Sequence, residues 1–203
     1  MRKSFLSTAV LILAFSAGAL LFLLWPRSDD GTATGAGTGP ELAQWATRKI
    51  KAMLFYVSAD GARLVPVERD VPFGEDTAEQ ARRIVEAQLA SPPPEVASAI
   101  PPGTSLRALY VTDRGQAFVD LSREVTAAHP GGSVNEILTV YSIVEALTAN
   151  LPAISTVQIL VDGREVDTLA GHVDLRRPLS KSTMWLESAQ PAVAARPAGA
   201  SRP

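Results

Sequence analysis

An uncharged apolar segment near the N-terminus constrains this chain more than any other feature. From Phe5 to Trp25 the sequence carries no charged residue and ends in leucines and aromatics. As a helix the segment is about 30 Å long, which matches the hydrocarbon core of a bilayer. Two basic residues precede it, so the positive-inside rule keeps residues 1–4 in the cytoplasm. The sequence therefore predicts a transmembrane signal anchor at residues 5–25 and a cell-membrane protein whose remainder is extracytoplasmic.

A cleaved signal peptide is the alternative. Its apolar region usually spans about 7–15 residues and ends at small residues. Here the apolar run continues through the small residues 16–19, and a cut there would leave Leu20–Trp25 on the mature protein. We favour a retained anchor, and both alternatives export the rest of the chain.

Composition divides the remainder into three parts. Residues 26–48 are rich in Gly and Thr and predict a flexible tether, whose reach is about 20 Å by the scaling for Gly-rich chains. Residues 181–203 are rich in Ala and Pro and predict a disordered tail. Residues 49–180 carry the apolar periodicity of one folded domain.

Cysteine usage and charge exclude several classes of function. The chain has no cysteine, so it has neither disulfides, nor a thiolate metal site, nor a lipid-anchoring cysteine. Its formal net charge is −2 at pH 7. The pairs Arg82-Arg83 and Arg176-Arg177 are too sparse for a basic face, so nucleic acid is not an expected partner.

The first half of the domain predicts two hairpins separated by a helix. Extended segments at 52–58 and 64–68 flank Asp60-Gly61, and Pro66 is typical of an edge strand. Asp76 or Thr77 can cap a helix whose apolar stripe is Ala81, Ile84, Val85 and Leu89. The second hairpin pairs 106–111 with 116–121.

The second half predicts a long helix followed by a strand. Ser133 and Glu136 form a capping-box pattern, and a single apolar stripe follows at Ile137, Val140, Tyr141, Val144, Leu147 and Leu151. Residues 157–161 predict a strand, 166–169 a short returning strand, and 171–175 the end of the domain. This order predicts an α+β fold, a mixed sheet with two helices packed on one face.

The chain contains two histidines, His129 and His172. Neither lies in a metal-binding spacing such as His-Glu-x-x-His, and no Gly-x-Ser-x-Gly elbow accompanies them. We therefore predict no catalytic, cofactor or metal site. A hydrolase remains a distant alternative, which would need one of these histidines in a cleft beside a carboxylate.

Two weaker patterns have structural explanations. Gly131-Gly132-Ser133 precedes a helix, where backbone N–H groups can bind anions, but the Walker and dinucleotide patterns are absent. We expect these glycines to shape a tight loop. A set of carboxylates is expected at turns and strand ends and cannot be paired across a cleft from sequence: Asp113, Asp120, Glu124, Asp162 and Asp174.

Laid end to end, the elements resemble the GerMN domain, a family named for a sporulation and spore-germination protein. The similarity covers most of residues 51–179. It rests on segments in a fixed order: Leu54–Ser58, Leu64–Arg69, Ile100–Thr104, Ala117–Ser122, Gly132–Val144, Val157–Gly163 and Gly171–Leu175.

The resemblance implies a non-catalytic module of the bacterial cell envelope, and it supplies no catalytic residues. This chain differs from the tandem sporulation protein in having one copy of the domain and an apolar anchor. We expect a tethered interaction module that binds envelope proteins or itself. The alternative is a peptidoglycan-binding module with Trp45, Tyr56 and Tyr110 as sugar-stacking groups; packing in the sheet is the competing role for both tyrosines.

Overall fold

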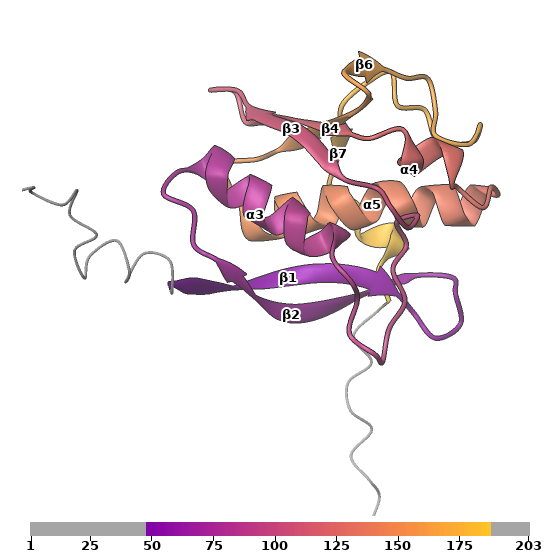
Figure 1. Ribbon diagram of the computed structural model, residues 1–203, viewed down its shortest axis with the longest axis horizontal. Helices are drawn as coiled ribbons and strands as arrows, with labels where there is room; N and C mark the ends of the chain where they lie inside the picture. The colour runs from indigo at the N-terminus through magenta and orange to yellow at the C-terminus, as the bar shows by residue number, and fades with distance from the viewer. Residues whose placement is uncertain (1–47, 188–203) are drawn as a thin grey trace, which may run out of the picture. The chain divides into compact units, whose positions relative to one another are not determined.

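The computed structural model describes residues 48–187 (Figure 1). The predicted anchor at 5–25, all but the last residue of the tether and the tail beyond 187 lie outside the described residues. Within the described part, no helix combines the length and apolar character needed to cross a membrane.

Two helices lie between two β-sheets in this domain (Figure 1). The first sheet is an antiparallel hairpin, and the second has five strands in the order β3-β4-β5-β6 with β7 also paired to β5. The strands are β1 (Lys49–Val57), β2 (Leu64–Pro72), β3 (Leu106–Val111), β4 (Gln116–Leu121), β5 (Thr156–Val161), β6 (Arg164–Glu165) and β7 (Leu179–Ser180). The helices are α3 (Thr77–Leu89), α4 (Glu124–Ala127), α5 (Ser133–Asn150) and the 3-10 helix η1 (Thr183–Trp185).

The five-stranded sheet is mixed, as predicted. β3 and β4 are antiparallel, whereas β4 and β5 are parallel because α5 connects them as a crossover. The α+β class is therefore confirmed. The prediction of one sheet is wrong, because β1 and β2 form a separate sheet that covers the opposite side of the helices.

The separate sheet of β1 and β2 explains why α5 is buried on two sides. The sequence predicts one core-facing stripe, but the helix is also buried at Glu136, Thr139, Ser142 and Glu145, off that stripe. Because α5 packs against β1 on one side and β5 on the other, it presents apolar surface in two directions. Its polar residues therefore need partners inside the protein.

The helix starts confirm one predicted cap and correct the other. Asp76 caps α3, since its Oδ1 accepts the backbone N–H of Glu79 at 2.7 Å. The predicted capping box of Ser133 and Glu136 is wrong: Gly132 is the N-cap of α5, and no side chain caps it. The Glu136 side chain instead accepts backbone N–H groups of Leu169 and His172, as described below.

Side-chain amides from the two helices close the inner edge of β1. The Phe55 N–H donates to Gln88 Oε1 at 2.9 Å, and Gln88 Nε2 donates to the Phe55 carbonyl at 2.7 Å. Asn150 does the same for Met53, at 2.8 Å and 2.7 Å. Two residues further along β1, the Val57 N–H donates to the Ala97 carbonyl. Two amides and one loop thus replace a neighbouring strand along β1.

The C-terminal end of the described chain differs from the prediction. The predicted strand at 166–169 is absent; the pairing with β5 comes from β6 and β7 instead. The predicted domain ends at residue 180, but the described chain continues to residue 187. The Trp185 ring packs against Tyr141 with centroids 6.1 Å apart, and the Glu187 N–H donates to the Leu64 carbonyl at 2.8 Å.

Candidate functional site

The outer edge of β2 is protected against pairing with another chain. The backbone groups of Met53 and Phe55 point away from β2. Residues that face each other across an antiparallel pair point their backbone groups the same way, either toward each other or apart. The backbone groups of Pro66, Glu68 and Asp70 therefore point away from β1, toward the free side of β2. Proline has no N–H to offer, and charges oppose strand pairing. This agrees with the prediction that Pro66 marks an edge strand.

The outer edge of β3 has no such protection. Thr112 donates its N–H to the Gln116 carbonyl, so these two residues form a hydrogen-bonded pair at the β3–β4 turn. The register places the next such pair at Tyr110 and Phe118. Bonded pairs with β4 alternate along an antiparallel ladder, so the backbone groups of Leu109 and Val111 point away from β4. Among residues 48–187, neither backbone is bonded to a loop or a second strand. β3 therefore presents an open edge.

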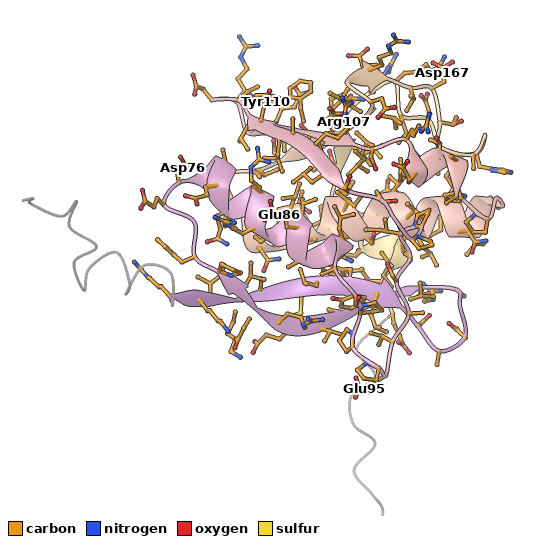
Figure 2. The ribbon with its side chains drawn as sticks, viewed as in Figure 1. Asp76, Glu86, Glu95, Arg107, Tyr110 and Asp167 are labelled. Carbon is orange, nitrogen blue, oxygen red and sulfur yellow. The ribbon has the colours of Figure 1, made fainter. Side chains whose placement is uncertain are left out.

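An exposed aromatic residue lies on this strand. Leu109 faces the core and is 4% exposed, so its neighbour Tyr110 points to the opposite face, where it is 66% exposed. Figure 2 shows Tyr110 directed away from α3. Its cross-strand partner is Phe118, which is half-buried. The pair forms an aromatic patch beside the open edge.

A β-bulge at Arg107 limits the open edge at one end. The register shifts between Leu106 and Ala108, which leaves Arg107 as the extra residue. Its Nη1 lies 3.4 Å from Asp120 Oδ2 and 3.4 Å from Asp162 Oδ1. Asp120 also accepts the Gly163 N–H at 2.7 Å. Two of the predicted turn carboxylates thus meet at Arg107, where they fix the bulge and the β5–β6 turn.

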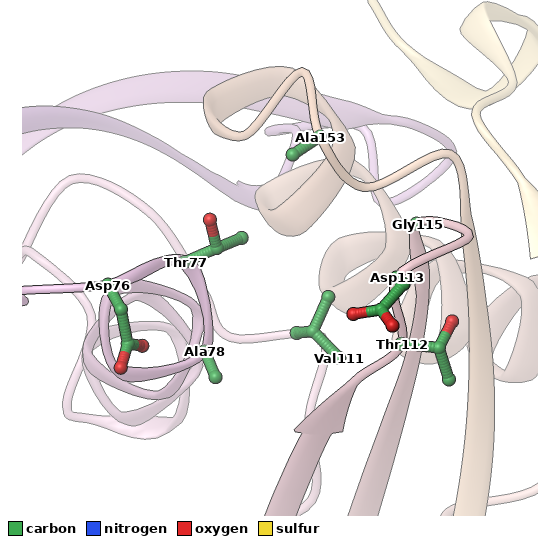
Figure 3. Close-up of a pocket in the computed structure, with 8 residues that line it drawn as sticks. All are labelled: Asp76, Thr77, Ala78, Val111, Thr112, Asp113, Gly115 and Ala153. Carbon is green, nitrogen blue, oxygen red and sulfur yellow. The ribbon is translucent and has the colours of Figure 1, made fainter.

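A hollow of about 380 Å³ lies at the other end of the edge, between the start of α3 and the β3–β4 turn (Figure 3). Val111, Asp113 and Thr77 are among the residues that line it. Gly115 fixes the turn: its φ is +77°, and a Cβ there would lie 2.5 Å from the Ala153 carbonyl oxygen. The β3–β4 turn therefore packs closely against the α5–β5 loop at Gly115.

Of the predicted histidines, His172 pairs with the buried carboxylate of Glu136. His172 Nδ1 lies 3.1 Å from Glu136 Oε2, which also accepts the His172 backbone N–H at 2.7 Å. Oε1 accepts the Leu169 N–H at 2.8 Å. Burial raises the pKa of Glu136, but the backbone N–H groups of Leu169, Ala170, His172 and Val173 outweigh that effect, and the net pKa is lowered. Glu136 therefore holds a loop as an ionised acceptor.

His129 occupies a separate hydrogen-bond chain. The Gly131 N–H donates to His129 Nδ1 at 3.0 Å, which assigns the proton of the neutral ring to Nε2. Nε2 lies 3.3 Å from Thr139 Oγ1, which donates to the Ala99 carbonyl at 2.6 Å. Burial lowers the pKa of His129, the Glu136 charge opposes this shift, and His172 adds to it. Thr139 is completely buried, so its hydroxyl is no accessible nucleophile.

The remaining predicted residues have structural roles or lie apart. Gly131 and Gly132 both have positive φ and form the tight entry to α5, as expected. Asp174 pairs with its neighbour Arg176, which holds the pKa of that carboxyl well below its usual range. Tyr56 is completely buried and bonded to Arg69, so it cannot stack on a sugar. Trp45 lies outside the described residues.

Sequence reasoning did not single out four polar residues that shape the edges and the core, which are Gln88, Asn150, Arg107 and Glu145, nor the aromatic Phe118 beside Tyr110. Glu145 is completely buried; its Oε1 accepts the Ser182 N–H at 2.6 Å, and its Oε2 has no hydrogen-bond partner among residues 48–187. The sequence contains one signal for these buried polar residues. Glu136, Thr139 and Glu145 lie among apolar residues of the long predicted helix, a pattern typical of buried polar side chains that bond other segments.

Two solved structures of a sporulation protein are similar to this arrangement. The tandem GerMN domains of the sporulation protein GerM from Bacillus subtilis match with a TM-score of 0.52 at 21% identity. That match covers 66% of this chain and 46% of the tandem protein. The first GerMN domain of the same protein matches with a TM-score of 0.51 at 18% identity, covering 65% of this chain and 98% of the domain. These identities establish the fold alone.

A comparison of the sequence with curated proteins finds no significant match. The family model described as "Germane: Sporulation and spore germination" matches residues 53–167, more than half of the chain. The match includes both long helices and runs from within β1 to the loop after β6, so that β7 lies beyond it. The chain belongs to the Germane family of sporulation and spore-germination domains.

Proposed function

We propose that this chain is a non-catalytic interaction module of the bacterial cell envelope, tethered to the membrane and placed outside the cytoplasm. Its partner adds a strand to the open edge of β3. The single observation that carries this proposal is the contrast between edges: β1 is closed by amides, β2 is protected by Pro66 and acidic residues, and β3 is open.

Tethering and orientation rest on the sequence. The apolar segment 5–25 is long enough to span a bilayer, and basic residues precede it. The Gly-rich residues after it would let the domain reach partners near the membrane surface. A non-catalytic role is supported by the two histidines, which are both engaged in hydrogen bonds that hold loops.

Photo-crosslinking in intact cells tests the proposal. A photoreactive amino acid replaces Tyr110 at the edge, or Val134, which is 48% exposed on α5, as the matched control. We expect specific adducts at position 110 that Val111→Pro abolishes, because proline removes the outward N–H of the edge. Identical adducts at both positions would refute strand addition at β3.

Peptidoglycan binding is the second candidate, and the exposure of Tyr110 beside Phe118 favours it. Aromatic faces stack on sugar rings, and the polar groups of Arg107 and Asp162 lie on the same side of the sheet. Tyr110→Val separates the two functions. It keeps a strand-forming residue and so keeps strand addition, but it removes the ring and so should abolish retention on purified cell-wall sacculi.

A further inference from the structure

We infer that the occupant of the β3 edge is a single extended segment of a partner protein, which carries a basic side chain into the hollow beside Val111. The inference rests on the proposed function and names the chemistry of the partner. It follows from the way α3 lies along β3, from the side chains that an added strand would point toward α3, and from the charge of the hollow.

The position of α3 limits what can lie against the edge. This helix packs against the core-facing side of β3 and lies beside that strand in Figure 1. A partner strand with its own helix or second layer on that side would therefore collide with α3. A lone extended segment occupies only about 5 Å next to a strand and brings no layer beneath it. The edge thus favours a terminus or an extended loop of the partner.

Two hollows lie at opposite ends of the α3–β3 pair. The hollow of about 380 Å³ lies between the start of α3 and the turn that leaves β3 (Figure 3). A second hollow, of about 360 Å³, lies between the end of α3 and the loop that enters β3, and its lining includes Leu89, Ile100, Pro92, Pro101 and Pro102. The six residues of β3 and the 13 residues of α3 both correspond to a length of about 20 Å. A segment of about six extended residues can therefore reach from one hollow to the other.

Strand geometry decides which side chains of the segment point toward α3. Residues that face each other on neighbouring strands place their side chains on the same face. Leu109 faces the core, and Val111 shares its face because it lies two residues further along. The residue that pairs with Val111 therefore points its side chain toward the hollow that Val111 lines. The residue opposite Tyr110 points to the other face, beside the exposed ring.

The hollow beside Val111 favours a positive side chain. Asp113 directs its carboxylate toward the start of α3, and neither Lys nor Arg is among the described residues that line the hollow (Figure 3). Asp113 forms no ion pair with another residue of the range 48–187. The helix start carries partial positive charge, but Asp76 at the N-cap and Glu79 in the first turn offset it. A Lys or Arg would pair with Asp113, whereas an acidic residue would be repelled.

The expected partner sequence follows from these positions. A Lys or Arg faces Val111, and the next residue, which faces Tyr110, is β-branched or aromatic and packs against the ring. Further along, an apolar residue fits the proline-lined hollow at the end of α3. Main-chain hydrogen bonds to Leu109 and Val111 give affinity, and the hollows give specificity.

Peptide selection on the full chain in lipid nanodiscs tests the inference. A displayed library of random peptides is first depleted on the Val111→Pro variant, whose edge has lost an outward N–H, and is then selected on the natural chain. We expect the enriched peptides to share a Lys or Arg followed by a β-branched or aromatic residue. Selection on Asp113→Lys should exchange the basic residue for an acidic one.

A matched variant and a binding measurement complete the test. Asp167→Lys changes an exposed carboxylate in the loop after β6, at the opposite edge of the sheet, and should leave the basic preference unchanged (Figure 2). In fluorescence anisotropy with one enriched peptide, Asp113→Asn should weaken binding about two- to fivefold, because exposed ion pairs contribute little. Equal thermal unfolding of the natural chain and each variant shows that weaker binding is not a folding defect.

The outcomes separate this inference from the proposed function. Enriched peptides without a basic residue, or the same peptides on the natural chain and on Asp113→Lys, would overturn the inference. Selection that yields no peptide specific for the natural chain over Val111→Pro would overturn it as well. Strand addition as the function survives any of these results when the photoreactive group at position 110 still gives specific adducts that Val111→Pro abolishes.

Discussion

Gln88 pairs with the backbone of Phe55 as a neighbouring strand would. Its amide oxygen accepts the Phe55 N–H and its amide nitrogen donates to the Phe55 carbonyl, inside a completely buried site. The residue therefore serves two purposes. It satisfies two buried backbone groups, and it occupies the side of β1 on which another strand could add.

Replacing Gln88 with Leu should strongly destabilise the domain. The side chain keeps its approximate volume, but both Phe55 backbone groups lose their partners. Since each orphaned buried group costs about 1–3 kcal/mol, we expect urea unfolding to show a loss of at least about 2 kcal/mol. Glu86→Leu, exposed on the same helix (Figure 2), should change the free energy by less than about 0.5 kcal/mol. Equal losses in both variants would contradict this role.

Glu136 should make the domain sensitive to acid. Its pKa is lowered in the fold, so the folded state favours the ionised carboxylate. Its contribution is therefore fully present above the unfolded pKa of about 4.5 and is lost as the pH falls through the folded pKa. Glu136→Gln should lower stability at pH 7 and remove this acid dependence in urea titrations. A variant that keeps the slope below pH 4.5 would assign the effect to other carboxylates.

His129 should add a second pH dependence at a higher pH. Its pKa is lowered from 6.5, because burial favours the neutral ring and the Gly131 N–H occupies Nδ1. Above pH 6.5 both the folded and unfolded states are neutral at this residue, so its contribution is complete. Below pH 6.5 the unfolded chain gains a proton first, and stability falls until the folded pKa is reached. The difference in unfolding free energy between the natural chain and His129→Gln should therefore shrink as the pH falls below 6.5.

Glu145 should have the opposite effect on the pH dependence of stability, because it destabilises the fold at high pH. Burial raises its pKa, and the Ser182 N–H and the Lys181 charge do not offset the shift. The folded state thus favours the protonated acid, so the ionised form destabilises the fold above the folded pKa, and stability is regained as the pH falls toward 4.5. Glu145→Gln retains an acceptor for Ser182 and should raise the midpoint of urea unfolding at pH 8 but not at pH 4. A lower midpoint at pH 8 would refute this assignment.

Gly115 and Gly61 offer a matched pair of substitutions. Both have positive φ, +77° and +72°, so an alanine at either position should lose about 1–2 kcal/mol from backbone strain. A Cβ at position 61 meets nothing within 4 Å, whereas one at position 115 would collide with the Ala153 carbonyl oxygen. We expect Gly115→Ala to be the more destabilising by thermal unfolding. Equal losses would mean that the β3–β4 turn can move away from the α5–β5 loop.

Local patterns were sufficient for several elements of the fold. The hairpin of β3 and β4 has the predicted bounds, because its alternation and its Asp-Arg-Gly turn are both short-range signals. The Asp76 cap is likewise confirmed, since the capping oxygen and the N–H it accepts lie three residues apart. The resemblance carried by the ordered segments is confirmed as well, because the family model matches residues 53–167.

The sequence by itself thus determined both long helices, the strands β1 to β5, their order and the family, because these depend on neighbours along the chain. The tertiary structure alone decided that β1 and β2 form a second sheet, that α5 is buried from two sides, and that Glu136 holds the loop at 169–173 in place of capping its own helix. It also decided which strand edge is open. A buried polar group takes whichever partner the packing of distant segments brings within hydrogen-bond distance, and that choice leaves no periodic pattern in the sequence.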